Sequence, residues 1–301
     1  MELWVYITVA AAFLQNLRSA MQKRLTGRLS TTGATFVRFG FGFPFAIVYV
    51  FALHHVFGMD WPVLHIRFAL FGAAGGLAQI LGTFLLLHLL SYRNFVVGTA
   101  YSKTDTVQAA LFGIVILGDQ IGLGAAIAIS IAMTGVISIS VARTEVTVRS
   151  LILSFTERRA LIGLASGAMF GISAVFYRAA SLSLGGPGFL MPAGFTLVCV
   201  SIFQTLVMLG YMRLREPGQI TDVMKSWRPS LAVGMSGIAG SACWFTAMTI
   251  QNVAYVRALG QIELIFTFIA SYFFFHERSN RREVAGVILV AGGILILLLA
   301  G

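Results

Sequence analysis

RNFVVGTAYSKTD, at residues 93–105, aligns without a gap with QNVAYVRALGQIE, at residues 251–263. The constant offset of 158 places the acidic residue Asp105 over the acidic residue Glu263. Both acids lie in the middle of long apolar segments. The alignment therefore indicates two related halves, each with a carboxylate at the same buried depth. Such a pattern is more typical of a protein that moves molecules than of one that reacts with them.

The composition excludes a soluble globular domain. Of the 301 residues, 58% are hydrophobic and 11% are charged, and the mean hydropathy is +0.88, whereas a soluble domain carries about 25% charged residues. Because backbone polar groups must be satisfied inside a bilayer, such a chain crosses it as helices or as a closed barrel. The apolar runs are continuous and roughly 20 residues long, which favours helices over the shorter alternating strands of a barrel. The predicted fold class is an all-α integral membrane protein.

Ten transmembrane helices are predicted, with short connections between them. Their approximate limits are 3–22, 31–53, 68–91, 95–117, 121–141, 160–181, 188–212, 230–250, 253–275 and 283–300. Both cysteines, Cys199 and Cys243, lie within predicted spans. Neither a disulfide framework nor a metal cluster is therefore expected, and we expect no cofactor.

The net charge of +10 does not indicate a nucleic-acid partner, because the basic residues follow the predicted topology. The connections after even-numbered spans hold Arg67 as their only Lys or Arg. Those after odd-numbered spans hold fifteen: Lys23, Arg24, Arg28, Arg93, Arg143, Arg149, Arg158, Arg159, Arg213, Arg215, Lys225, Arg228, Arg278, Arg281 and Arg282. Since basic residues accumulate on the cytoplasmic side, we expect a bacterial-type inner-membrane protein with both termini outside. Anionic lipid is the expected partner of these residues.

The offset of 158 also relates positions outside the opening alignment. It aligns Gly82 and Thr83 with Gly240 and Ser241, Asp119 with Glu277, and Gly135 with Gly293. We therefore predict a first five-helix repeat at 1–143, a cytoplasmic connection at 144–159 and a second repeat at 160–301. Because five is an odd number, consecutive repeats lie in opposite orientations in the membrane. Inverted repeats place the substrate site near the midplane, where the halves meet.

Three stretches resemble the drug/metabolite transporter superfamily. IVILGDQIGLGAAIAISIAMTGVISI (114–139) and YFFFHERSNRREVAGVILVAGGILIL (272–297) are similar to the ends of its two repeats. The second is close to the EamA-type pattern of an apolar run, a turn like Gly-Glu-Arg and a glycine-rich final helix. FVRFGFG (36–42) is similar to the family's arginine early in the second span. One departure lies at 118–120, which read Gly-Asp-Gln where the family usually has Gly-Glu-Arg.

The resemblance covers nearly the whole chain and implies the EamA fold of two inverted five-helix repeats. Family members export amino acids and other metabolites, and relatives carry nucleotide sugars or drugs. The resemblance therefore implies export of a small molecule, with amino-acid exporters of the YddG type as the favoured group and aromatic or other apolar amino acids as substrates. Exporters of drugs, organic cations or nucleotide sugars are the alternative. Many members keep their termini in the cytoplasm, so the opposite orientation expected here leaves the direction of transport open.

Charges at the bilayer centre are the first candidates for a functional site, because each costs ~2.5 kcal/mol or more without a partner or a water-filled cavity. Seven lie deep in predicted spans: Arg18, Arg38, Lys103, Asp105, Arg178, Arg257 and Glu263. The four arginines lie close enough to span ends for their long side chains to reach the interface. Lys103, Asp105 and Glu263 lie too deep for that explanation.

Helical periodicity sorts the charged residues of the fourth span. Tyr101, Asp105 and Gln108 have the i, i+4, i+7 spacing that shares one face of a regular helix. Lys103 points away from Asp105 on that helix, so the two are not expected to pair with each other.

In the ninth span, Arg257 and Gln261 share a face and Glu263 is turned away from Gln261. Pairing between the halves is therefore predicted, Lys103 with Glu263 or Asp105 with Arg257. As a structural ion pair, these groups would fix the register of two spans.

The alternative to a structural ion pair is a site for a zwitterion. Asp105 and Glu263 would accept the ammonium group of an amino acid, and Lys103 and Arg257 would bind its carboxylate. The same acids are candidates for a coupling proton, since a medium of low dielectric constant favours the neutral form of a carboxylic acid.

Five further residues on other spans are predicted to line the substrate site. They are Gln15 in the first span, Gln79 and Thr83 in the third, Tyr177 in the sixth and Trp244 in the eighth. Tyr101, Gln108 and Gln261 complete this set near the central charges. The alternative for Thr83 is a hydrogen bond to the preceding turn, and the alternative for Trp244 is packing.

Enzyme functions are disfavoured. The chain has no phosphate-binding glycine-rich loop on a soluble domain, no metal-ligand spacing and no Ser/His/Asp order with a supporting domain. An intramembrane enzyme that uses Asp105 and Glu263, a channel and a membrane scaffold are the alternatives from other classes. The inverted repeat favours alternating access, and one chain already contains both halves of such a unit, so a monomer is expected to suffice.

Overall fold

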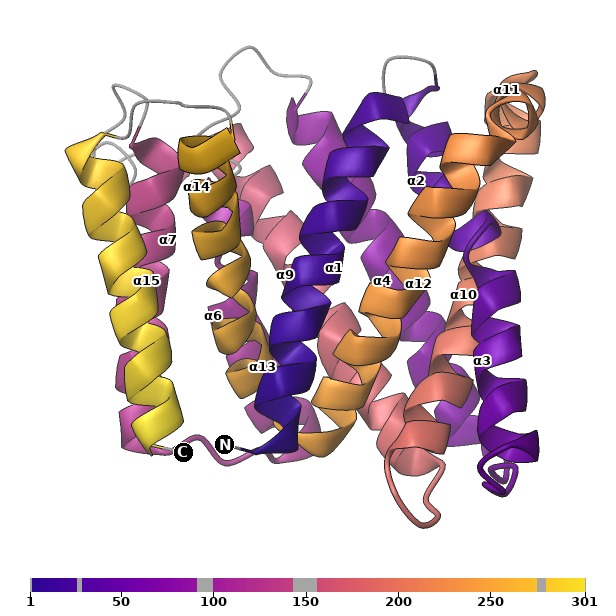
Figure 1. Cartoon of the computed structure of the whole chain (residues 1–301), viewed down its shortest axis with the longest axis horizontal. Coiled ribbons are helices and arrows are strands. Elements are labelled where there is room, and N and C mark those ends of the chain that lie inside the picture. The colour runs from indigo at the N-terminus through magenta and orange to yellow at the C-terminus, as the bar shows by residue number, and fades with distance from the viewer. Residues whose placement is uncertain (1, 26–28, 91–99, 143–155, 275–279, 301) are drawn as a thin grey trace. The chain divides into compact units, whose positions relative to one another are not determined.

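The computed structural model describes residues 2–25, 29–90, 100–142, 156–274 and 280–300, and every regular element in these ranges is helical (Figure 1). By length and composition, seven segments in them can cross a membrane. They are Thr31–His55, Ile66–Leu89, Leu123–Val141, Arg158–Ser183, Leu190–Arg215, Trp227–Ile250 and Arg281–Leu299. The all-α membrane class is therefore confirmed, and the count of ten spans stays a prediction.

The chain forms two compact units. Unit 1 comprises residues 1–77 and 176–250, and unit 2 comprises 78–175 and 251–301. Each unit takes segments from both halves of the sequence, and the boundaries fall inside the helices α4 (Ile66–Leu90) and α9 (Arg158–Ser183). The predicted repeats at 1–143 and 160–301 describe a duplication of the sequence, which is a different division from these two units. They stay a prediction.

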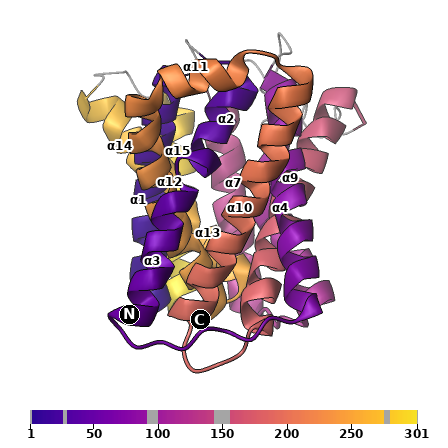
Figure 2. The same ribbon diagram turned by 90° about the vertical axis from the view of Figure 1, so that its right-hand side faces the viewer.

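Unit 1 contains the start of α4 and the end of α9 together with six other helices. These are α1 (Leu3–Leu25), α2 (Thr31–Gly40), α3 (Phe43–His55), α10 (Leu190–Arg215), α11 (Gln219–Lys225) and α12 (Trp227–Ile250). The span predicted at 31–53 consists of α2 and α3, which meet at Phe41 and Gly42 (Figure 2). Pro44 follows this junction, and its missing N–H and fixed φ prevent α2 from continuing.

Glycines on α12 allow its neighbours in unit 1 to approach closely. A Cβ atom on Gly234 would lie 2.6 Å from the carbonyl carbon of Phe41, and one on Gly240 would lie 3.3 Å from Cβ of Leu14. Small residues at such contacts are a usual means of packing helices in a membrane. They bring α1 and the α2–α3 junction onto one stretch of α12.

Unit 2 contains the remaining parts of α4 and α9 together with six further segments. These are α6 (Asp105–Phe112), the π-helical segment η1 (Gly113–Leu117), α7 (Leu123–Val141), α13 (Val253–Gly260), α14 (Ile262–Phe274) and α15 (Arg281–Ala300). α7 and α15 run side by side (Figure 1). A Cβ on Gly135 would lie 2.6 Å from the carbonyl oxygen of Gly286, and one on Gly293 would lie 2.7 Å from the amide nitrogen of Ala132.

Large apolar side chains are exposed on helices of both units. Leu214 in unit 1 is 81% exposed, and Leu299 in unit 2 is 88% exposed. Soluble monomers rarely expose extended apolar surface, whereas lipid tails solvate it. The exposed leucines, like the composition, therefore indicate that lipid surrounds this fold.

Candidate functional site

The fourth and ninth predicted spans are interrupted at their charged residues. A turn at Lys103 and Thr104 follows helical residues 100–102, and α6 then begins at Asp105. In the ninth span, α13 ends at Gly260 and α14 begins at Ile262. The expectation of continuous helices over 95–117 and 253–275 is therefore wrong at these two points. Residues 91–99, which include most of the first aligned stretch, lie outside the described residues.

Two ion pairs join the interrupted spans within unit 2. Nζ of Lys103 lies 3.4 Å from Oε1 of Glu263, and Arg257 Nη2 pairs with Asp105 Oδ2. Both predicted pairings between the spans are thereby confirmed. The side chain of Asp105 is 10% exposed and that of Lys103 is 39% exposed, so the pair of Asp105 and Arg257 is the better shielded.

The interruptions also explain why both acids are tolerated at membrane depth. Asp105 lies in the first turn of α6, and Glu263 lies in the first turn of α14. The first amide groups of a helix have no partner within it and carry a partial positive charge, which stabilises a nearby carboxylate. Each acid therefore interacts favourably with both a cation and a helix N-terminus.

Two glycines of α9 lie against the first interruption. A Cβ on Gly167 would lie 2.9 Å from the carbonyl oxygen of Ser102, and one on Gly171 would lie 3.1 Å from that of Asp105. Because glycine has no side chain, the backbone of α9 can lie directly on the turn. The turn thus lies in contact with a helix that is distant in sequence.

Side-chain hydrogen bonds support the same turn. Thr104 Oγ1 donates to the carbonyl oxygen of Tyr101 at 2.6 Å, and Gln108 Nε2 donates to Thr104 Oγ1 at 2.7 Å. Gln261 Nε2 donates to Thr106 Oγ1 at 2.9 Å and so links the two interrupted spans. Backbone irregularity at membrane depth requires such partners.

The predicted common face of Tyr101, Asp105 and Gln108 depends on a regular helix, and the turn interrupts that helix between the first two. Tyr101 packs against Ala100 and Val141. In this conformation Gln108 supports the turn, and Tyr101 belongs to the packing of unit 2.

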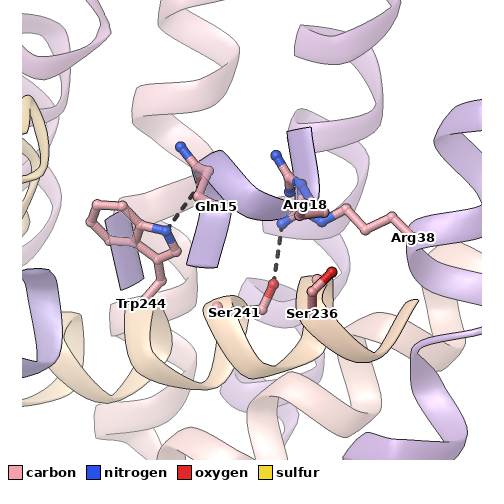
Figure 3. A pocket seen from close by; sticks show the side chains of 8 residues that line it. Gln15, Arg18, Arg38, Ser236, Ser241 and Trp244 are labelled. Atoms are coloured by element: carbon pink, nitrogen blue, oxygen red, sulfur yellow. Dashed lines mark hydrogen bonds between the residues drawn. The ribbon is translucent and has the colours of Figure 1, made fainter. Parts of the chain in front are cut away.

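A second polar cluster lies in unit 1, where a cleft opens between α1, α2 and α12 (Figure 3). Trp244 Nε1 donates to Gln15 Oε1 at 3.1 Å, so two separately predicted residues are in contact. Arg38 Nη2 donates to Ser241 Oγ at 3.2 Å, and Arg18 also lines the cleft. Arg18 and Arg38 are therefore partly buried and line a cleft of unit 1, and Arg18 Nη2 also donates to Ser19 Oγ at 3.3 Å.

The remaining predicted residues have local partners. Tyr177 is 3% exposed, stacks on Phe245 with ring centroids 4.6 Å apart, and accepts a hydrogen bond from Gln204 Nε2 at 3.2 Å. Thr83 Oγ1 donates to the carbonyl oxygen of Gln79 at 2.8 Å, which is the bond to the preceding turn considered above. Tyr177 thus lies in the core of unit 1, and Thr83 and Gln79 lie on α4 within unit 2.

Ser241 and Thr106 were not predicted as site residues, although both bond to residues of the two clusters. For Ser241 the sequence held a signal, since it aligns with the predicted residue Thr83. Thr106 carries no comparable signal, because its role depends on the position of Gln261 in space.

Interrupted membrane helices with charged residues at the interruption are typical of carriers, which hold ions and polar substrates at such points. Residues 158–299 match the EamA-like transporter family, and this match places the chain in the drug/metabolite transporter superfamily. The resemblance noted in the sequence is confirmed. The chain is accordingly a multi-pass membrane transporter of the drug/metabolite type, and the match indicates a transporter rather than an enzyme.

Comparison with solved structures supports the fold over the whole chain. One crystal structure of a protein superposes with a TM-score of 0.72 and covers 99% of this chain and 96% of its own, at 15% sequence identity. At that identity the likeness concerns the fold alone. A search among curated proteins found no match.

Proposed function

We propose that the protein is a secondary active transporter that exports amino acids, including aromatic or other apolar ones, or similar small metabolites across the inner membrane. It works by alternating access, with ten spans in two inverted five-helix repeats and a single chain as the transport unit. The observation that carries the proposal is the interruption of two aligned spans at Asp105 and Glu263, each paired with a cation of the other span. The described contacts between the two interrupted spans include two charge pairs and a hydrogen bond, which can break and re-form during transport.

The same acids are proposed to carry the coupling proton. Protonation of Asp105 or Glu263 neutralises the acid and releases Arg257 or Lys103. A carboxylate cannot hold a proton and the ammonium group of a substrate equally well at the same time, so competition between them gives exchange. Lys103 and Arg257 are occupied by the acids here, and they become available to a substrate carboxylate only after a pair opens.

Counterflow in proteoliposomes tests the function and the substrate class. The panel contains labelled amino acids, nucleotide sugars and a quaternary ammonium drug. We expect saturable exchange of amino acids and accumulation that collapses when the proton gradient is removed. Exchange of the quaternary cation without any amino acid would favour a drug exporter, and flux that does not saturate would favour a channel.

Two variants test the proton role, with a matched control. Asp105→Asn and Glu263→Gln are expected to abolish accumulation driven by a proton gradient. Asp222→Asn is the control, because Asp222 is an exposed acid on α11 whose partner, Lys225, is also exposed. Intact pH-driven transport in the first two variants would rule out Asp105 and Glu263 as proton carriers.

A further inference from the structure

The cleft in unit 1 combines two arginines with neutral polar and aromatic groups. Its lining consists of Gln15, Arg18, Arg38, Ser236, Gly237, Gly240, Ser241 and Trp244. Among these described residues none is acidic. We propose that the cleft binds the anionic group of the transported substrate while Lys103 and Arg257 are still paired with acids. Under the function proposed above, on which this inference rests, that group is the carboxylate of an amino acid.

The two arginines converge on one point of α12. A Cβ on Gly237 would lie 3.3 Å from Cδ of Arg18 and 3.3 Å from Cγ of Arg38. Arg18 comes from α1 and Arg38 from the last turn of α2, so their side chains meet over this glycine (Figure 3). Two like charges on neighbouring, partly buried side chains repel each other. An anion bound between them attracts both and makes the net interaction favourable.

The hydrogen-bonding groups of the cleft suit a carboxylate. A guanidinium group presents its N–H donors in a planar fork that matches two carboxylate oxygens. Ser241 accepts one hydrogen bond from Arg38 Nη2 and so fixes the head group over α12. The other N–H groups of the Arg38 guanidinium lie in the same plane and point in other directions.

Trp244 lines the cleft with an aromatic ring. Its side chain is buried, and its indole N–H donates to Gln15 Oε1 at 3.1 Å, which fixes the ring beside the arginines. A flat apolar surface next to two guanidinium groups suits a substrate with an apolar or aromatic part close to its carboxylate.

The size of the cleft limits what enters it in this conformation. Its open space is about 160 Å³ only when the part open to the surroundings is included, and almost none of it would admit a water molecule. Binding of a carboxylate therefore requires the arginine side chains to move.

Competition experiments in proteoliposomes of neutral lipid test the assignment. The labelled substrate is phenylalanine, and the competitors are phenylalanine and phenylalaninamide, which keeps the ring and the ammonium group but lacks the carboxylate. In the unmodified protein the amide is expected to compete roughly 10- to 100-fold less well, the effect of losing a charge-assisted hydrogen bond. Arg18→Gln and Arg38→Gln are each expected to raise the half-saturating concentration of phenylalanine by a similar factor and to remove the preference over the amide.

Two further variants complete the set. Arg228→Gln removes the same charge from an exposed residue at the start of α12 and is expected to behave as the unmodified protein. Arg38→Lys keeps the charge but loses the planar fork, and an intermediate half-saturating concentration is expected. Size-exclusion profiles and unfolding midpoints establish that each variant is folded.

The possible failures are distinguishable. If the protein exchanges phenylalanine but Arg18→Gln and Arg38→Gln match Arg228→Gln, the cleft assignment is wrong and the proposed function stands. If no amino acid is exchanged, the proposed function fails, and the cleft is tested by thermal unfolding in detergent with acetate or inorganic phosphate. Stabilisation that is lost in Arg18→Gln and Arg38→Gln, but not in Arg228→Gln, supports an anion site, and equal stabilisation of all variants overturns it.

A lipid phosphate offers the same oxygen chemistry as a substrate carboxylate. Effects of Arg18→Gln and Arg38→Gln that appear only in vesicles with phosphatidylglycerol, without any competition by phenylalanine, would assign the cleft to a lipid head group. That result would overturn the substrate assignment.

Discussion

Asp105 and Arg257 show what an interior charge requires at the scale of single residues. Arg257 is paired with an acid that lies at the N-terminus of α6, so each charge has a partner of opposite sign. Removing one partner of a buried pair leaves the other uncompensated, which costs about 3–5 kcal/mol, although replacing both by neutral groups often costs little. The pair is therefore expected to behave as a unit.

A double-mutant cycle tests this unit. Arg257→Gln and Asp105→Asn are each expected to lower the thermal unfolding midpoint in detergent, and the double variant is expected to lose much less than the sum of the two. The matched surface pair is Asp222 and Lys225, 3.7 Å apart with side chains 54% and 75% exposed, for which the coupling should be about 0–1 kcal/mol. Additive effects of Arg257→Gln and Asp105→Asn would contradict a coupled pair.

The partners of the central charges were predictable from the sequence, whereas the arginine cleft was not. Depth and alignment mark Lys103, Asp105 and Glu263, because few explanations exist for a charge in mid-span. Arg18 and Arg38 lie nearer to span ends, where interface contact explains them equally well. Their convergence on Gly237 depends on how α1, α2 and α12 pack, which helical periodicity within one segment does not encode.

Where two helices touch at a glycine, the space for an added side chain can be read from the distances to the neighbouring helix. On α15, a Cβ at Gly293 would lie 2.7 Å from the backbone nitrogen of Ala132 and 2.8 Å from the carbonyl oxygen of Ala128, both on α7. At the adjacent Gly292 a Cβ would meet nothing within 4 Å. Backbone atoms cannot move aside as the end of a flexible side chain can, so α7 and α15 would have to separate.

Gly293→Ala is therefore expected to destabilise unit 2 by about 1–3 kcal/mol, the usual cost of an overpacked contact. Gly292→Ala adds the same methyl group one residue earlier and is expected to be neutral or slightly stabilising, since alanine favours the helix. Thermal unfolding midpoints of the two variants in one detergent provide the measurement. Equal midpoints would contradict close packing of α7 on α15 at this glycine.

Helix limits and helix interruptions differ in how well the sequence predicts them. Where a predicted limit falls on described residues, it agrees with the structure to within about three residues, for example 283–300 against Arg281–Ala300. The junction of α2 and α3 has a visible cause in Pro44. The interruptions at Lys103 and Gln261 lack a proline, and the first depends on its contact with Gly167 and Gly171 of α9, which no local pattern in the fourth span reveals.

At the scale of the whole molecule, the orientation in the membrane is predicted from charge rather than from packing. The predicted cytoplasmic connections hold fifteen of the Lys and Arg residues, and the opposite connections hold Arg67 alone. Basic segments accumulate on the cytoplasmic side of a membrane, so the bias predicts that connections after odd-numbered spans stay inside. Asp60 lies in the connection after the second predicted span and Arg215 at the end of the seventh, and both are exposed.

Single cysteines at these two positions test the orientation. In a background with Cys199 and Cys243 replaced by alanine, a membrane-impermeant maleimide applied to intact cells is expected to label Asp60→Cys. Arg215→Cys should react only after the membrane is permeabilised, because its segment is predicted to lie in the cytoplasm. The reverse labelling pattern would place both termini inside and would show that charge bias does not determine the orientation of this chain. It would leave the proposed inverted repeat untouched, since two repeats of five spans would face opposite ways in either orientation.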